Sequence, residues 1–279
     1  MDKEKFESLY PENVRDMPES IIRKLLNMTN DKSIISFGGG LPDPETFPID
    51  MLEDAIDDVC IMHWREAFQY GSTEGHNWLR EELSKWMSRE GIISSIDNIL
   101  PTSGSQQGLD LLGKLFIGKG DRIIVEEPSY LGALQAFSLY QPQFIGIPLD
   151  SDGMKTDILE NKLKKFDSRV KFIYVVPDFQ NPAGVTLSYE RRQDILELSD
   201  RHGFIVIEDS PYRELRYRGE TIPSIYALAQ EEGMNNVISL RTFSKTISPG
   251  LRIGWITADK EIIKTLVKLK QGADLCSPV

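Results

Sequence analysis

The segment KFIYVVPDFQNPAGVTLSYERRQDILELSDRHGFIVIED, residues 171–209, predicts the fold class of this chain. It opens with the β-branched run KFIYVVP and closes with a second one, GFIVIED. Between them, the stretch from Ser188 places Ile195 and Leu198 on one face of a helix that ends at Gly203. Two strands joined by a helix form a βαβ unit, in which the strands run parallel.

The same alternation continues on both sides of this unit, from about residue 100 onward. Further strands are expected at RIIVEE, NVISL and RIGWITA, which start at Arg122, Asn236 and Arg252. A helix is expected at SQQGLDLLGKLF from Ser105, where three apolar side chains share one face. The sequence therefore predicts an α/β protein, with a large domain built on a mostly parallel central sheet that helices flank.

The first hundred residues follow a different pattern. Helices are predicted over 20–28, 51–62 and 78–89, and a Gly/Pro-rich loop, SFGGGLPDPETFP at 36–48, separates the first two. Such a loop carries a site or serves as a plain connection. At the other end, KEIIKTLVKLKQGADLCSPV, residues 260–279, predicts an amphipathic helix.

Composition and charge narrow the classes of function. Among 279 residues, 32 Lys and Arg stand against 43 Asp and Glu, a formal net charge of −11, which argues against nucleic acid as a partner. No apolar run approaches the roughly 20 residues that span a bilayer, and the first residues lack the apolar region of a signal peptide, so no membrane partner is expected. Two cysteines, Cys60 and Cys276, point to a reducing compartment, and we expect a soluble cytoplasmic protein.

Several common site motifs are missing from the sequence. It contains no GxGxxG after a strand, no GxxxxGK[ST], no GxSxG and no HExxH, which removes the usual support for dinucleotide, P-loop, α/β-hydrolase and zincin sites. His63, His76 and His202 are not spaced as metal ligands, and no metal site is expected. The acidic turn from Asp150 to Gly153 lacks the later glutamate of a calcium loop and indicates a hairpin turn.

The motif TSGSQQG at residues 102–108 has the form of a phosphate site. A short Gly/Ser loop that opens into a helix presents free backbone N–H groups at the positive end of the helix dipole. A simple N-cap at Ser103 or Ser105 explains the same letters equally well.

Polar side chains also follow three of the predicted strands. Asn181 comes after KFIYVVP, and Asp209 and Tyr212 come at the end of GFIVIED. The loop TFSKTISPGLRIGW (242–255) adds Lys245, an amine nucleophile, and Arg252, a second clamp for an anion, although both fit solvated loop charges too. Ligands of open α/β sheets bind beyond the carboxyl ends of the strands. A phosphate cradle, a carboxylate, a phenol, an amide and a lysine are what a pyridoxal phosphate (PLP) site requires.

Together these stretches resemble a fold type I PLP-dependent aminotransferase of class I/II, and most closely the 2-aminoadipate and kynurenine aminotransferase branch. The resemblance rests on SFGGGLPDPETFP, YGSTEGHNWLR, SGSQQGLDLLGKLF, EEPSYLGALQAF, PDFQNPAG, EDSPYREL and TFSKTISPGLRIGW, and it runs from about Arg23 to the last residue. It implies PLP as the cofactor and amino acids and 2-oxo acids as substrates.

The resemblance implies a role for each residue around the cofactor ring. Lys245 would form the internal aldimine and move a proton between the substrate Cα and the cofactor C4′. Asp209 would hold the pyridine nitrogen protonated, while Tyr212 and Asn181 would hydrogen-bond O3′. Tyr130 would stack on the ring. The expected catalytic residues are therefore Lys245, Asp209 and Tyr212.

The resemblance also implies how the phosphate is held and that the protein is a homodimer. The expected phosphate-binding residues are Gly104, Ser105, Gln106, Thr242, Ser244 and Arg252. Family members more often carry Ser at the position of Thr242, a change that keeps the hydroxyl. Tyr70 matches a tyrosine that reaches the phosphate of the neighbouring subunit, so two copies of the chain would share their sites.

For the substrate, the resemblance points to Gly39, Gly40 and Asn181. Arg23 matches a position where some relatives carry an arginine, on a mobile helix, that faces an acidic side chain; a surface arginine at the start of a helix is the alternative. If the match holds, glutamate and 2-oxoglutarate are one donor and acceptor pair.

The resemblance also implies a division of the chain into domains, and it leaves more than one activity open. Residues 1–50 would belong to a small domain and residues 51–279 would form the PLP-binding large domain, while the C-terminal part of the small domain, with the arginine that clamps the substrate α-carboxylate, would be absent from this chain. The leading expectation is an aminotransferase that moves an amino group from 2-aminoadipate, an aromatic or another bulky amino acid to 2-oxoglutarate. A PLP-dependent lyase or decarboxylase, and a PLP-binding fragment without turnover, stay open.

Overall fold

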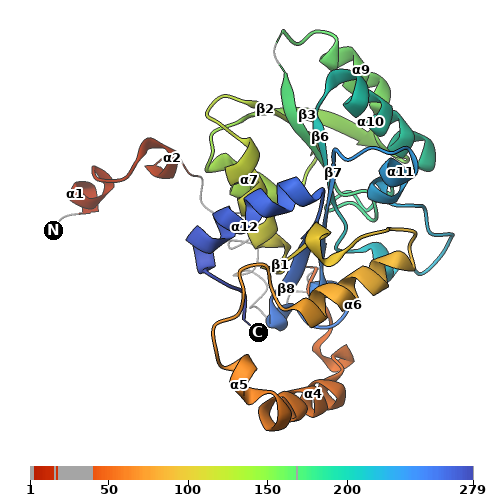
Figure 1. Cartoon of the computed structure of the whole chain (residues 1–279). Helices are drawn as coiled ribbons and strands as arrows, with labels where there is room; N and C mark the ends of the chain where they lie inside the picture. The colour runs from red at the N-terminus through yellow and green to blue at the C-terminus, as the bar shows by residue number, and fades with distance from the viewer. Residues whose placement is uncertain (1–2, 16, 18–39, 168, 279) are drawn as a thin grey trace, which may run out of the picture.

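The computed structural model describes residues 3–15, 17, 40–167 and 169–278 (Figure 1). The strands are β1 (Ile99–Ser103), β2 (Arg122–Glu127), β3 (Gln143–Asp150), β4 (Gly153–Met154), β5 (Val170–Val175), β6 (Ile205–Asp209), β7 (Val237–Thr242) and β8 (Ile253–Thr257). The α-helices are α1 (Lys3–Glu7), α2 (Glu12–Arg15), α4 (Ile49–Met62), α5 (Trp64–Ala67), α6 (Asn77–Ser88), α7 (Gly104–Phe116), α8 (Leu131–Ser138), α9 (Thr156–Leu163), α10 (Tyr189–His202), α11 (Ile225–Glu231) and α12 (Lys260–Asp274). Short 3-10 turns are η1 (Pro44–Thr46), η2 (Ile96–Asn98), η3 (Arg213–Leu215), η4 (Phe243–Lys245) and η5 (Pro249–Leu251).

The strands form one sheet in the order β1-β8-β7-β6-β5-β2-β3-β4. From β3 to β7 all neighbours are parallel, whereas β8 runs antiparallel to both β7 and β1. The expected α/β fold with a mostly parallel sheet is confirmed. The five predicted strands are confirmed as β2, β5, β6, β7 and β8, with ends that differ by at most two residues.

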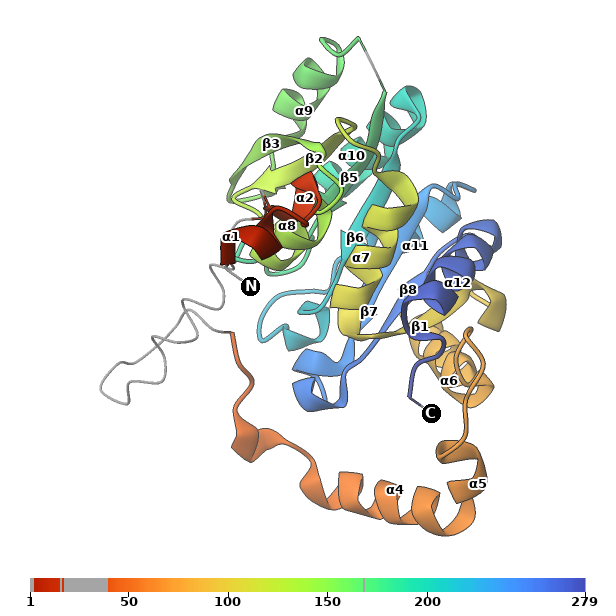
Figure 2. The same ribbon diagram turned by 90° about the vertical axis from the view of Figure 1, so that its left-hand side faces the viewer.

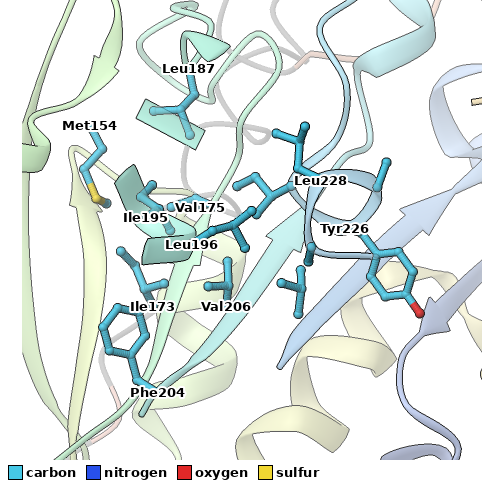
Figure 3. Packing of buried hydrophobic residues seen from close by; sticks show 14 of the residues in the cluster. Met154, Ile173, Val175, Leu187, Ile195, Leu196, Phe204, Val206, Tyr226 and Leu228 are labelled. Atoms are coloured by element: carbon cyan, nitrogen blue, oxygen red, sulfur yellow. The ribbon is translucent and has the colours of Figure 1, made fainter. Parts of the chain in front are cut away.

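The sheet is covered on both faces, as parallel sheets are. Along β5, Phe172 and Tyr174 pack with α7, α8 and α12, while Ile173 and Val175 pack with α9, α10 and α11 on the other face. Successive side chains of a strand point to opposite faces, which is why one strand supplies both cores. Figure 2 shows α7 and α12 on one side of the sheet, and Figure 3 shows the core on the α10 side, where Ile195 lies among strand residues.

Local signals place the helix ends where the sequence predicts them. The Ser188 side chain accepts a hydrogen bond from the backbone of Arg191 at the start of α10, and Gly203 ends the helix with φ of 69°. The predicted helices at 51–62, 78–89 and 260–279 correspond to α4, α6 and α12. The helix predicted over 20–28 lies outside the described residues.

The hairpin expected at the acidic turn is confirmed, because Asp150 of β3 pairs with Gly153 of β4 in antiparallel register. The strand β3 itself was not predicted from the sequence. The two-residue β4 covers only its last residues, so most of β3 is an edge, where Pro148 is tolerated.

Residues 49–70 stand apart from this body. Figure 2 shows α4 and α5 reaching away from the sheet. Within the described part of the chain, α4 has no buried residue, although it carries Ile56, Val59 and Ile61. No described helix is long and apolar enough to cross a membrane.

Candidate active site

Three of the predicted site residues meet at the carboxyl ends of β5, β6 and β7, which are parallel neighbours in the sheet. Asn181 lies in the loop after β5, Asp209 is the last residue of β6, and Lys245 ends the turn η4 that directly follows β7. Parallel strands bring these chain positions to one edge although 64 positions separate the first from the last (245 − 181).

Asp209 is buried, and its two carboxylate oxygens have different surroundings. The Tyr174 hydroxyl donates a hydrogen bond of 2.8 Å to Oδ2, whereas Oδ1 has no partner among the described residues. Burial raises the pKa of Asp209 to about 7; the hydrogen bond from Tyr174 opposes this shift and the Glu208 carboxylate adds to it. Oδ1 is therefore an acceptor that the described residues leave without a donor.

Asn181 and Tyr212 form a pair next to this carboxylate. The Asn181 side-chain amide donates to the Tyr212 hydroxyl at 2.9 Å. Burial raises the pKa of Tyr212, the Asn181 hydrogen bond lowers it, and the Asp209 carboxylate raises it. The hydrogen bond thus holds a phenol and an amide side by side. Both groups can therefore bind the same polar atom of a ligand.

The loops that carry this pair are held by a buried ion network. Asp178, fully buried, accepts hydrogen bonds from Arg192 at 2.9 Å and from Arg213 and Arg216 at 3.1 Å. Asp178 lies three positions before Asn181, and Arg213 directly follows Tyr212. The network therefore fastens both loops to α10. Sequence reasoning missed it, because nothing in the local pattern pairs an aspartate with arginines on other elements.

The N-terminus of α7 is built as an anion cradle. Gly104 has φ of 70°, and a Cβ atom at this position would lie 2.5 Å from Nη2 of Arg252. Gly254 is equally constrained, since its Cβ would lie 2.6 Å from the backbone nitrogen of Ser105. Ser103 occupies the N-cap position of α7, as one interpretation predicts, but its side chain makes no cap hydrogen bond to the described residues. The first amides of α7 have no partner within the helix and lie beside a guanidinium group, so they can bind an anion.

The end of β7 and the turn that follows it hold two hydroxyls and the lysine. The Thr242 hydroxyl donates to the carbonyl of Ile253 at 3.0 Å and lies 2.8 Å from the Ser244 hydroxyl. The Lys245 amine donates to the carbonyl of Gly40 at 2.8 Å, and burial lowers its pKa. Gly40 thus lies beside the lysine, and the lowered pKa biases the amine toward the neutral form that a nucleophile or base requires.

Two further predicted residues flank the cradle. The Gln106 side chain donates to the carbonyl of Gly132 at 3.0 Å and so connects α7 to α8. The Tyr130 ring lies against Gly132, where a Cβ would come within 2.5 Å of its Cζ. Burial raises the pKa of Tyr130 to about 12, helped by the Asp209 carboxylate and by Tyr212, so Tyr130 keeps its proton.

The other predicted residues stay outside this cluster. The Tyr70 side chain is 80% exposed. Arg23 and Gly39 lie outside the described residues. Tyr174 and Gly254, in contrast, were missed; the available signal for Tyr174 was a phenol inside the apolar strand KFIYVVP, since a buried tyrosine needs a partner for its hydroxyl. Among the described residues, no three His, Cys, Asp or Glu side chains are grouped to hold a metal ion.

The fold and this site define an α/β protein with a lysine, a carboxylate and an anion cradle at the carboxyl edge of its sheet. Residues 34–279 match the family model of aminotransferase class I and II, and the chain belongs to that family.

The names of similar proteins support this family assignment. The aromatic-amino-acid aminotransferase 1 of Thermococcus litoralis is 48% identical over 276 residues, which cover 98% of this chain and 66% of that protein. The 2-aminoadipate transaminase of Thermus thermophilus is 41% identical over 260 residues, covering 93% and 64%. A crystal structure of Pyrococcus horikoshii kynurenine aminotransferase with PMP, KYN and KYA is 47% identical, with a TM-score of 0.92, covering 98% of this chain and 68% of that one. The chain spans about two thirds of the length of these proteins.

Proposed function

We propose that the protein is a PLP-dependent aminotransferase. The observation that carries the proposal is the buried Oδ1 of Asp209, which has no partner among the described residues and lies at the same sheet edge as Lys245. An acceptor buried without a donor is costly in a protein interior. A protonated pyridine nitrogen is the donor that a PLP ring supplies, so the residues present fit this cofactor.

The remaining groups of the site match the other groups of PLP. The first amides of α7, from Gly104 to Gln106, and the Arg252 guanidinium hold the phosphate, with the Thr242 and Ser244 hydroxyls beside them. Asn181 and Tyr212 bind O3′, and Tyr130 stacks on the ring. These assignments are supported by the shared location of the groups at one edge of the sheet.

Bound PLP supplies an electron sink for the carbanion at the substrate Cα. Asp209 keeps the ring nitrogen protonated, which maintains this sink. Lys245 would move the proton between the substrate Cα and the cofactor C4′, and the burial that lowers its pKa favours the neutral amine that a base requires. Tyr212 and Asn181 orient the ring through O3′.

The substrates we propose are a bulky amino donor, either 2-aminoadipate or an aromatic amino acid, and 2-oxoglutarate as acceptor. The names of the relatives, an aromatic-amino-acid aminotransferase, a 2-aminoadipate transaminase and a kynurenine aminotransferase, support this class. Gly40 beside Lys245 supports a substrate loop at this place. Arg23 and Gly39 stay predicted substrate contacts.

We further propose a homodimer. Its support is the arm of residues 49–70, which exposes large apolar side chains in the described part of the chain: Ile49, Met51, Ile56, Val59, Ile61, Met62, Trp64, Phe68 and Tyr70. An exposed apolar surface of this extent marks an interface, and a second copy of the chain would place Tyr70 near its phosphate site. A cytoplasmic location is supported by Cys60 and Cys276, which are both unpaired.

The test is the visible absorption of the protein loaded with PLP, before and after glutamate is added. Conversion of the cofactor to its amino form, and production of glutamate from 2-oxoglutarate in the full reaction, are expected. A lyase or decarboxylase would release its product without glutamate formation. A cofactor band that ignores every amino donor would establish a PLP-binding chain without turnover, and failure to bind PLP would overturn the proposal.

A further inference from the structure

The hydroxyl of Tyr174 is enclosed by the core and directed at Asp209. In the parallel register of β5 and β6, Tyr174 lies opposite Ile207, and Asp209 is two residues further along on the same face. The Tyr174 side chain is fully buried, and its ring packs edge-on against Phe137 with centroids 5.7 Å apart. The core therefore fixes the ring, and the fixed ring aims its hydroxyl at one carboxylate oxygen.

That hydroxyl has a single use among the described residues, the hydrogen bond of 2.8 Å to Oδ2 of Asp209. A buried hydroxyl cannot turn to water, so the bond is its only means of satisfaction. Because Oδ2 is occupied in this way, the carboxylate can rotate only at the cost of this bond. Oδ1 is left as the acceptor available to a ligand.

We propose that Tyr174 is a positioning residue for the cofactor: its hydroxyl holds the Asp209 carboxylate by Oδ2 and so reserves Oδ1 for the pyridine nitrogen. The inference rests on the proposed function. Tyr174 is fully buried, so in this role it would act through Asp209 and not by contact with a ligand.

The charge state of Asp209 supports the same role. Burial drives this carboxyl toward its neutral form, and the Tyr174 hydrogen bond is the interaction that opposes burial. Burial raises the pKa of Tyr174 well above its ordinary value, so its hydroxyl stays a donor. Loss of the hydroxyl should therefore raise the pKa of Asp209 and weaken the hydrogen bond of Asp209 to a protonated ring nitrogen.

The experiment compares Tyr174→Phe with wild type in binding PLP and 1-deaza-PLP, an analogue with carbon in place of the ring nitrogen, to the apoprotein. Phenylalanine keeps the ring and its packing. Tyr140→Phe is a matched control, because Tyr140 also donates to an aspartate, Asp110, at 2.8 Å but lies outside the site. Fluorescence titration at pH 7 measures both dissociation constants.

We expect Tyr174→Phe to weaken PLP binding about tenfold, the usual effect of losing a hydrogen bond to a charged group, while binding of 1-deaza-PLP stays at the wild-type value. In an Asp209→Asn background, the same replacement should change neither constant. Tyr140→Phe should match wild type with both ligands. Infrared titration of the apoprotein should show Asp209 protonating at higher pH in Tyr174→Phe.

Unchanged PLP binding in Tyr174→Phe would overturn the inference, as would an equal loss for PLP and 1-deaza-PLP, which would indicate a general packing role. Both results leave the proposed function standing if the wild-type protein transaminates. Failure of the wild-type protein to bind PLP overturns the proposed function and this inference with it.

Discussion

The Arg252 guanidinium group packs directly on Gly104, so that a methyl group on Gly104 would have to displace it. A Cβ atom on Gly104 would lie 2.5 Å from Nη2 and 3.0 Å from Cζ of the Arg252 side chain. This contact joins the start of α7 to the loop before β8, and it brings the helix amides and the guanidinium group to one place.

Replacement of Gly104 with alanine should therefore weaken cofactor binding. Alanine at φ of 70° costs about 1–2 kcal/mol of stability, and the methyl group displaces Arg252. We expect a lower melting temperature and a dissociation constant for PLP that rises at least tenfold, measured by fluorescence titration. Gly272→Ala is the control: Gly272 lies in α12 with nothing within 4 Å of its Cβ position, so helix propensity predicts unchanged or improved stability. Equal PLP affinity in the two variants would contradict the cradle.

Lys245→Ala should abolish turnover while the chain still folds. Loss of a positioned general base typically costs 10²–10⁴ in rate, and the half-reaction with glutamate, followed by stopped-flow absorption, should slow by at least this factor. Borohydride reduction and peptide mass spectrometry should find the cofactor on residue 245 of the wild-type protein. Lys162→Ala removes another amine that donates to a glycine carbonyl, that of Gly146 at 2.7 Å. This control should turn over normally, and a similar loss in both variants would contradict the role of Lys245.

The stability of the apoprotein should depend on pH through Asp209. Its pKa is raised from 3.8 to about 7 by burial, so between these values the folded state binds more protons than the unfolded state. The free energy of unfolding then falls as pH rises from about 4 to about 7. Urea unfolding of Asp209→Asn at several pH values should show a smaller fall than wild type.

Part of the fall should remain in that variant, because burial also raises the pKa of Glu126 to about 8. Glu126→Gln should remove this second part. In contrast, Arg191 lowers the pKa of Asp150 to about 2, so Asp150→Asn should leave the slope between pH 5 and 7 unchanged. An identical slope in wild type and Asp209→Asn would show that Asp209 is ionised in the folded apoprotein at this pH.

Asp178→Asn should destabilise the protein strongly, because it removes the fully buried carboxylate that pairs with Arg192 and Arg216 and one of the two carboxylates that pair with Arg213. Breaking a buried ion pair typically costs about 3–5 kcal/mol, and urea unfolding should show a loss of this size. Since the same network fastens the Asn181 and Tyr212 loops, PLP affinity should fall as well. Asp150→Asn removes a more exposed contact to Arg191 and should cost much less; equal losses would contradict the importance of the buried network.

The elements predicted from sequence were those with strong local signals. The strand GFIVIED and the helix that starts at Ser188 and ends at Gly203 follow from periodicity and capping residues alone. The strand β3 was missed because Gly146 and Pro148 interrupt its apolar run; an edge position tolerates them, and only the sheet order defines that edge. In the site, Asn181, Asp209 and Lys245 were predictable because polar residues follow apolar strands.

Residues that act through a partner were not predictable in this way. In the sequence, Tyr174 is one more position of an apolar strand, because its partner Asp209 lies on the neighbouring strand β6. Asp178 is likewise an ordinary loop aspartate in the sequence, because the arginines that bind it come from other elements. Neither the partner of Tyr174 nor the partners of Asp178 stand at a fixed spacing from it along the chain.

By itself, the sequence determined the alternation of strands and helices, their ends, and the kinds of chemical groups carried by the loops, because periodicity, capping and turn preferences act over a few neighbouring residues. Only the tertiary structure decided which strands are neighbours, that Tyr174 occupies one oxygen of Asp209 while the other has no partner in the described part of the chain, and that Gly104 meets Arg252. Burial and hydrogen-bond partners depend on segments that are distant along the chain. These segments meet only when the strands assemble into the sheet and helices cover both of its faces.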